Sequence, residues 1–542
     1  NTNAGAVNTS NETIIVSRNP WQTGDRVKYA NGGGATIGGL VNGGTYYVIV
    51  GPADSTRIKL SLTDGGAAID LTSSGTGTSH TLTTVTAQTD ALSTSLAGSP
   101  IDPAANILAV NISVAASGSV AVNAAFTGNV IANTIQAKIE DHASVHSTGG
   151  KVDLSADSKS GIIGVTVGVA GSGSVAVNAT GFGNVIANSV EALIEGGSTV
   201  TAASLVNISA EDTSSIRSLG ISVAGSGAVA VGVLFGANVV VDTVPARIDG
   251  SNVTSGTSLD VTATSDLDIM ALSGGVAASG TVGVLVSLTC NVITGFTTAE
   301  VVSGSVIDSG GAMTVKATNS SSIDALAFGV AAGTVGVGVA LSANLITNWT
   351  EALISGSTIT DAASLSVLSE SSSIIRSLSV NVGAGAVGVN VSVLGNMIIN
   401  DVRSTIEDST VTAVGDIVVS AQDLAPSSIP AWMVPTEYQA DLDACLDDSP
   451  IDLDANILSA TVNVAGGAVA VNVALVGNLI VNTTKTTISN STVTSNTGKV
   501  ELSSASESSI TSLNVGVAGG AVAVNVVGYG NLITSFVGST VE

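Results

Sequence analysis

One stretch of alternating small and apolar residues returns along the chain at a nearly constant interval. It reads GAVAVNVALVGNLIVN from Gly467, and near-copies begin at Ser119, Ser174, Ala386 and Ala521. The asparagine inside each copy sets the interval, and successive copies lie 55, 54, 53, 53, 52, 82 and 53 residues apart. The chain therefore carries eight units of about 53 residues, with an insertion of about 29 in the sixth interval. Self-similarity at such a period is typical of a solenoid or a repeat array.

Both halves of a unit predict β-strands. The first half alternates apolar and small residues, as in SLSVNVGAGAVGVNVSVLGN from Ser377, and the second half, STIEDSTVTAVGDIVVSAQ from Ser404, reads as short strands between Gly, Ser and Asp. A period of two indicates strands, and no repeat carries a helical period with caps. We expect an all-β protein built as an elongated parallel β-solenoid (β-helix). With two or three coils per unit, the array would be about 75–115 Å long, at roughly 4.8 Å per coil.

The first half of each unit has no charge on either side of its strand. We predict that Val387, Val389, Val391 and Val393 face inward, which places Gly388, Asn390, Ser392 and Leu394 on the opposite side. A solvated sheet face normally carries charged or long polar side chains. Both faces are therefore expected to be covered, either by a second layer of the same molecule or by neighbouring molecules.

The asparagine that marks the repeat is expected to be structural. Identical amides on successive coils can stack as ladders, and asparagine also suits left-handed turn geometry, in which it would close a corner of the coil. The small residue before it is cysteine in one unit, Cys290, which we interpret as a small buried thiol; a disulfide with Cys445 stays open. The asparagines are Asn129, Asn184, Asn238, Asn291, Asn344, Asn396, Asn478 and Asn531.

Two interruptions divide the array, and they enter at equivalent points, before Asn106-Ile107-Leu108 and Asn456-Ile457-Leu458. We expect a small β-barrel or β-sandwich module at 1–84, solenoid repeats at 85–423 and 457–542, and an acidic, proline-containing insertion at 424–456 that leaves from a corner of the coil.

Each interruption offers one candidate site. In the N-terminal module, the aromatic residues Trp21, Tyr46 and Tyr47 either stack on a glycan or form the core of a module too small to fold on valine alone. In the insertion, Asp441, Asp443, Asp447 and Asp448 supply oxygen ligands of the kind that Ca²⁺ prefers, although their spacing fits no EF-hand loop. The alternative for these aspartates is a solvated acidic loop.

Composition excludes several classes of function. The chain has 41 Asp and Glu against 15 Lys and Arg, a net charge of −26, which argues against nucleic acid as a partner. Apolar residues alternate and no long apolar run occurs, so we predict no transmembrane helix. Acidic residues such as Glu140, Glu195 and Glu407 recur once per unit instead of forming one cluster, so we expect no enzymatic activity and no cofactor other than the calcium considered above.

A second regular series consists of threonine pairs such as Thr358 with Thr360 and Thr410 with Thr412. Outward threonines on a flat sheet are one way to order water and bind ice, whereas Ser and Thr also simply suit exposed strands. An ice-binding surface is therefore one alternative function. A second alternative function is a carbohydrate-binding or carbohydrate-cleaving β-helix, in which the aromatic module binds the sugar.

The amino-acid sequences of some segments resemble those of a known family. The segments GDRVKYANGGGATIGGLVNGGTYYVIV (24–50) and IDLTSSGTGTSHTL (69–82) resemble modules of giant repetitive bacterial surface proteins, and units with STVTAVGDIVVSA from Ser409 resemble their adhesin- and hemagglutinin-like β-helix arrays. The resemblance implies an extracellular, cell-surface fibre in adhesion, sheath or biofilm matrix, and it carries over no catalytic residue. The leading hypothesis is thus a structural rod or filament segment that self-associates head to tail, because an open coil exposes strand edges, and also laterally.

Overall fold

The computed structural model describes residues 7–16, 21, 23–51, 54–63, 66–76, 80–85, 105–425 and 455–542. The chain divides into two compact units, Asn1–Pro103 and Ala104–Glu542. The four aspartates predicted to bind calcium, Asp441, Asp443, Asp447 and Asp448, lie outside the described residues, as does Cys445. Each unit is described by itself below.

The N-terminal unit is an antiparallel sheet with its own core. Its six strands follow the order β1 (Val7–Asn8), β2 (Thr13–Ile15), β5 (Asp54–Ser61), β4 (Thr45–Gly51), β3 (Arg26–Ala30) and β6 (Thr81–Val85). Tyr29 is buried at the centre of this core, where its hydroxyl accepts the Ile37 N–H at 2.9 Å and lies 2.7 Å from Nδ1 of His80. Burial raises the pKa of the Tyr29 hydroxyl.

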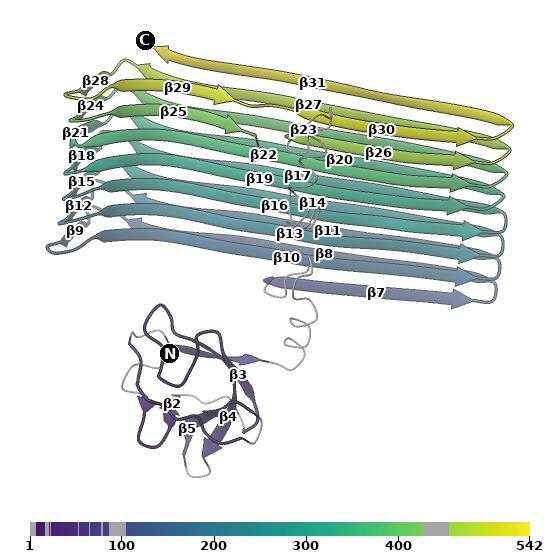
Figure 1. Ribbon diagram of the computed structural model, residues 1–542, viewed down its shortest axis with the longest axis horizontal. Helices are drawn as coiled ribbons and strands as arrows, with labels where there is room; N and C mark the ends of the chain where they lie inside the picture. The colour runs from purple at the N-terminus through teal and green to yellow at the C-terminus, as the bar shows by residue number, and fades with distance from the viewer. Residues whose placement is uncertain are drawn as a thin grey trace, which may run out of the picture. The chain divides into compact units, whose positions relative to one another are not determined.

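The second unit is a parallel β-solenoid, as predicted, and each repeat makes one coil of three strands (Figure 1). One long strand runs out, a tight turn reverses the chain, a second long strand returns, and a short strand closes the coil. The strands form three parallel sheets, which we call the entry sheet, the return sheet and the edge sheet. In Figure 1 the edge sheet lies at the left and the tight turns lie at the right.

The bounds follow the repeat closely. The entry sheet holds β7 (Ile107–Ser117), β10 (Val152–Ser172), β13 (Val206–Ser226), β16 (Leu259–Ser279), β19 (Ala312–Ala332), β22 (Ser364–Ala384), β25 (Ile417–Leu424), β26 (Ile457–Gly466), β29 (Val500–Ser506) and β30 (Ile510–Gly519). The return sheet holds β8 (Val120–Ile139), β11 (Val175–Ile194), β14 (Val229–Asp249), β17 (Val282–Val302), β20 (Val335–Ser355), β23 (Val387–Glu407), β27 (Val469–Ser489) and β31 (Val522–Val541). The edge sheet holds β9 (Ser144–Ser147), β12 (Thr199–Ala202), β15 (Asn252–Ser255), β18 (Val306–Ser309), β21 (Thr358–Ala362), β24 (Thr410–Ala413) and β28 (Thr492–Ser495).

Each unit makes one coil and not the two or three assumed for the estimated length, because the long strands are 20–21 residues each in most coils. Glycines such as Gly183 and Gly236 lie within these strands. A glycine need not end a strand whose backbone pairs on both sides in an unbroken register. The eight coils therefore stack over roughly 38 Å, while each long strand spans roughly 70 Å.

The side chains that point into the space between the entry and return sheets differ between the two ends of the long strands. In the half beside the edge sheet (the edge half), valine, isoleucine and alanine point inward, as Val206, Ile208 and Ala210 do in β13. In the half beside the tight turns (the turn half), the inward residues are Ala, Gly, Ser and Asn, as in Ser222 and Ala224 of the same strand. The outward residues there are apolar.

The predicted inward face is wrong, because the inward and outward residues are exchanged. Val387, Val389 and Val391 point outward and are half-buried, and Val393 is exposed, whereas Gly388, Asn390, Ser392 and Leu394 are buried. Small side chains fill the space between the two broad sheets, and many of the polar ones hydrogen-bond to each other, as Asn381 Nδ2 does to Ser392 Oγ at 2.5 Å. The entry sheet thus covers the small-residue face of this strand, and no described residue of the solenoid unit itself covers the valine face with a further layer.

Both interruptions enter the solenoid at one row of the entry sheet, as the sequence predicted, but not at a corner. β25 ends at Leu424 opposite Ser372, and β26 begins at Ile457 opposite Ile375, so β22 runs past the insertion without a break. β7 begins at Ile107 in the same row. The insertion therefore leaves from the middle of a broad face, because each coil has a long strand where a corner was expected.

The corner between the return and edge sheets requires a left-handed backbone. Gly250, Gly356, Asp408 and Asn490 have φ of 55°, 57°, 50° and 46°. Gly356→Val is expected to lower the free energy of unfolding by about 1–2 kcal/mol, the cost of placing an L-residue in this region. A Cβ at Gly356 meets no atom within 4 Å, so the effect is one of backbone strain alone.

Chemical denaturation measures this difference. Gly225→Val on β13 of the entry sheet is the matched control, since Gly225 has no positive φ and its added Cβ meets no atom within 4 Å. Equal loss in the two variants would show that the corner is not strained.

Candidate functional site

The eight repeat asparagines form one continuous amide ladder in the turn half. Each Asn Nδ2 donates to Oδ1 of the next asparagine at 2.8 Å, over all seven steps from Asn129 to Asn531. Seven of the eight are buried. The second hydrogen of the amide is also used in several coils, for example by Asn396, which donates to Ser377 Oγ at 2.9 Å. The asparagines lie in mid-strand, so the idea that they close corners is wrong.

A second buried polar row contains carboxyl groups. Burial raises the pKa of Asp242 to about 7, and the nearby Asp212 carboxyl acts in the same direction. Asp423 likewise has its pKa raised to about 7 by burial, although it accepts hydrogen bonds from Asn400, Asn482 and Ser506. These acids lie between the two broad sheets at 0% exposure. Their position makes them part of the polar interior, as the asparagines are.

The outward face of the return sheet is apolar over the whole turn half. The first 13 residues of each return strand contain no Asp, Glu, Lys or Arg in any of the eight coils. Charged pairs begin only beyond this zone, for example Arg403 with Asp401 at 2.6 Å, with the Arg403 guanidinium 4.4 Å from the centroid of the Trp349 ring. Because the strands pair in register, equivalent residues form straight rows across the coils.

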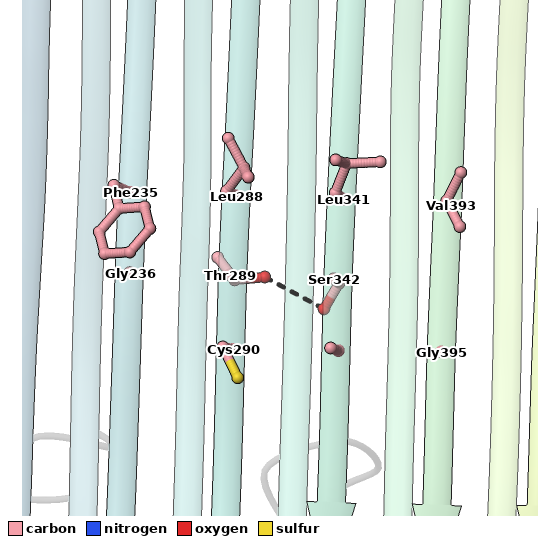
Figure 2. A pocket seen from close by; sticks show the side chains of 10 residues that line it. Phe235, Gly236, Leu288, Thr289, Cys290, Leu341, Ser342, Val393 and Gly395 are labelled. Atoms are coloured by element: carbon pink, nitrogen blue, oxygen red, sulfur yellow. Dashed lines mark hydrogen bonds between the residues drawn. The ribbon is translucent and has the colours of Figure 1, made fainter.

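Two adjacent rows shape this face. In six of the eight coils, large side chains make a row that we call the ridge: Phe126, Phe235, Leu288, Leu341, Val393 and Leu475. In the other two coils this row holds glycine, Gly181 and Gly528. The next outward row, which we call the trough, is small throughout: Gly128, Gly183, Ala237, Cys290, Ala343, Gly395, Gly477 and Gly530. Figure 2 shows both rows in the central coils.

The trough is a shallow apolar hollow. Its central part has a volume of about 400 Å³ and is lined by ridge and trough residues of four coils. Below it, Thr289 Oγ1 donates to Ser342 Oγ at 3.1 Å (Figure 2). Cys290 is exposed in the trough as a free thiol, so its interpretation as a buried thiol is wrong. The residue is outward because its strand has the opposite facing from the one predicted.

The aromatic residues of the N-terminal unit do not share one open face. Tyr46 is 3% exposed, and its hydroxyl accepts the Val41 N–H at 2.7 Å. Trp21 packs against the same core, and Tyr47 is half-buried on the opposite side of β4. Tyr46 is therefore a core residue and not a surface on which a sugar ring stacks.

The threonine series lies on the outward side of the edge sheet, with interruptions. Thr358 pairs in register with Thr410, which pairs with Thr492, whereas a register shift between Ile359 and Ala362 takes Thr360 out of this pairing. In β18 the equivalent positions are Val306 and Asp308. A regular threonine surface therefore extends over three coils only.

The ridge and trough were missed at the sequence level because the valines were assigned to the interior. The signal that could have identified them is the charge-free run itself. Among the described residues, no group of three or more His, Cys, Asp or Glu is placed to hold a metal ion. Within the described ranges, no helix is long and apolar enough to cross a membrane.

The fold defines the class of this protein as a parallel β-solenoid repeat protein. Comparison with protein-family models, with curated proteins and with solved structures finds no match to this chain. The function is therefore argued from the architecture alone.

Proposed function

We propose that the chain is a load-bearing structural segment of an extracellular bacterial surface fibre, of the adhesin or sheath type. Its role is mechanical, it is not an enzyme and it needs no cofactor. The partners in this proposal are further coils of the same kind, joined head to tail by the strand pairing that already joins neighbouring coils.

The observation that carries this proposal is the unbroken amide ladder from Asn129 to Asn531. It adds side-chain hydrogen bonds at 2.8 Å along the stacking direction, in parallel with the backbone pairing of three sheets. A force along the stack must break all of these bonds in one coil together before that coil separates. Such an arrangement suits a segment that transmits tension, and a catalytic or ligand-reading role does not require it.

Single-molecule force spectroscopy on the full chain tests the mechanical role. Since an extended chain spans about 3.3–3.6 Å per residue, each coil of about 53 residues is expected to release a contour length of about 18 nm, in a series of high-force events. The antiparallel N-terminal unit of the same molecule is an internal reference, and we expect the coils to unfold at higher force. Coils that open at lower force than this reference would overturn the load-bearing role.

Location is tested separately by antibody labelling of the cells that produce the protein. Labelling of intact cells is the expected result. Labelling that requires permeabilised cells would contradict an extracellular fibre.

A further inference from the structure

The outward face of the return sheet in the turn half is a large apolar area that the rest of the solenoid unit does not cover. Its outward positions form seven columns over eight strands, as in Val335, Val337, Val339, Leu341, Ala343, Leu345 and Thr347 of β20. Side chains inside the stack are substantially exposed, for example Phe235 at 55% and Leu341 at 37%. With strands about 4.8 Å apart and outward residues about 6.7 Å apart, the zone measures roughly 1,800 Å². A stable interface typically buries about 800 Å² on each partner.

The return sheet is also the broad sheet without interruptions. β25 and β26 show that the insertion leaves from the entry sheet, and β7 begins at the same row of that sheet. Every return strand from β8 to β31 runs without a break and in constant register with its neighbours. The return sheet is therefore the flatter and more regular of the two apolar faces.

The ridge and the trough are complementary to each other. They are neighbouring rows that run straight across the coils. The ridge is large in six of the eight coils, and the trough is small in all eight. Consider a twofold axis that is parallel to the stacking direction and lies between them. Rotation about this axis brings the ridge of one copy over the trough of the other at the same coil, and the trough over the ridge. An isologous interface requires this kind of self-complementarity.

We propose that the turn half of the return sheet binds a second copy of this chain face to face, with ridge in trough. Six of the seven columns then overlap, which buries roughly 1,500 Å² on each copy. Because the twofold axis is parallel to the stack, the two copies have the same polarity, and Leu341 of one copy lies over Ala343 of the other. The side chains pack dry, as in the interfaces between stacked sheets of identical register.

The two rows predict a charge-complementation experiment. Leu341→Glu and Ala343→Lys each place a charge in the interface of the full chain. Leu341 and Ala343 are both exposed in the single chain, so both variants are expected to fold. Each variant alone is expected to weaken dimerisation by about 100-fold or more, because an unpaired charge is buried. An equimolar mixture is expected to recover a heterodimer, since the introduced carboxylate of one variant then lies over the introduced ammonium of the other, while the second ridge-to-trough contact at this coil stays native.

Sedimentation velocity measures all three samples. Thr405→Glu is the matched control, because it adds a charge to an outward position of the same sheet that the second copy does not cover, and it is expected to dimerise like the native chain. The thiol of Cys290 gives an independent readout in a Cys445→Ser background: its reaction with a maleimide is expected to slow as the dimer forms.

Three results would overturn the proposal. The first is a native chain that stays monomeric at all concentrations, and the second is a mixture that recovers no heterodimer. The third is loss of binding to phosphatidylcholine vesicles in the Leu341→Glu variant while the native chain shows no self-association. The last result would identify an apolar surface such as lipid as the occupant. None of the three changes the force measurements on single molecules, so failure here is distinguishable from failure of the proposed mechanical role.

Discussion

Asn344→Leu is expected to lower the free energy of unfolding by about 2–6 kcal/mol. Asn344 is 2% exposed, donates through Nδ2 to Asn396 and accepts through Oδ1 from Asn291, each at 2.8 Å. Leucine is of similar size but makes neither bond, and it leaves the Asn291 amide hydrogen and the Asn396 oxygen buried without these partners. Each unsatisfied group costs about 1–3 kcal/mol.

Guanidinium denaturation gives the size of this effect, and hydrogen exchange gives its place. Repeat arrays can lose their cooperativity, so we expect the loss of protection to be greatest in β17, β20 and β23. Thr405→Leu on the neighbouring strand β23 is the control, because its side chain points outward and lies outside the apolar zone. If Asn344→Leu unfolded like the control, the ladder would contribute nothing to stability.

The stability of the protein is expected to fall as the pH rises from about 4 to about 8, and Asp423→Asn is expected to remove much of this fall. The pKa of Asp423 is raised from 3.8 to about 7 in the folded state by burial. Below pH 4 the carboxyl is protonated in both states, and between pH 4 and pH 7 only the folded state keeps its proton. Folding is thus favoured at low pH, and the advantage is lost as the pH passes 7. A shift of about three units corresponds to about 4 kcal/mol.

Unfolding midpoints between pH 4 and pH 8 measure the slope. Burial likewise raises the pKa of Asp242 to about 7, so the variant keeps part of the dependence. Asp308→Asn is the matched control, because Asp308 is exposed on the edge sheet, and it is expected to leave the slope unchanged. An Asp423→Asn variant as pH-dependent as the native chain would contradict a buried, protonated Asp423.

The repeat made the solenoid predictable, because a spacing of about 53 residues and a period of two can be read directly from the residues. The row at which both interruptions enter was predictable for the same reason, since Asn106 and Asn456 stand in identical local sequences. Both asparagines accept a backbone N–H through Oδ1, from Gly161 at 2.7 Å and from Ser509 at 3.0 Å.

The facing of the strands was not predictable from hydrophobicity. In VGVNVSVLGN the valines were assigned inward because burial of apolar side chains is the usual driving force. A stack of identical coils allows another solution. Asn396 donates to Asn478 in the next coil, and Asn381 of the facing sheet accepts from Asn390 through its carbonyl oxygen and donates to Ser392. That solution depends on neighbours that are distant in sequence. Because the inward and outward positions of this strand were exchanged, the ridge, the trough and the exposure of Cys290 were also missed.

The use of one coil per repeat has a mechanical consequence. The solenoid unit adds only about 4.8 Å of length for each coil, while its long strands span roughly 70 Å in breadth and its two broad sheets make a slab roughly 20 Å thick. For a beam of this section, the resistance to bending scales with the square of the dimension in the plane of bending. Such a unit would bend about ten times more readily across its broad faces than edgewise. An array of these units would therefore behave as a tape that curls in one preferred direction, and tapes of this kind can lie flat against a curved surface.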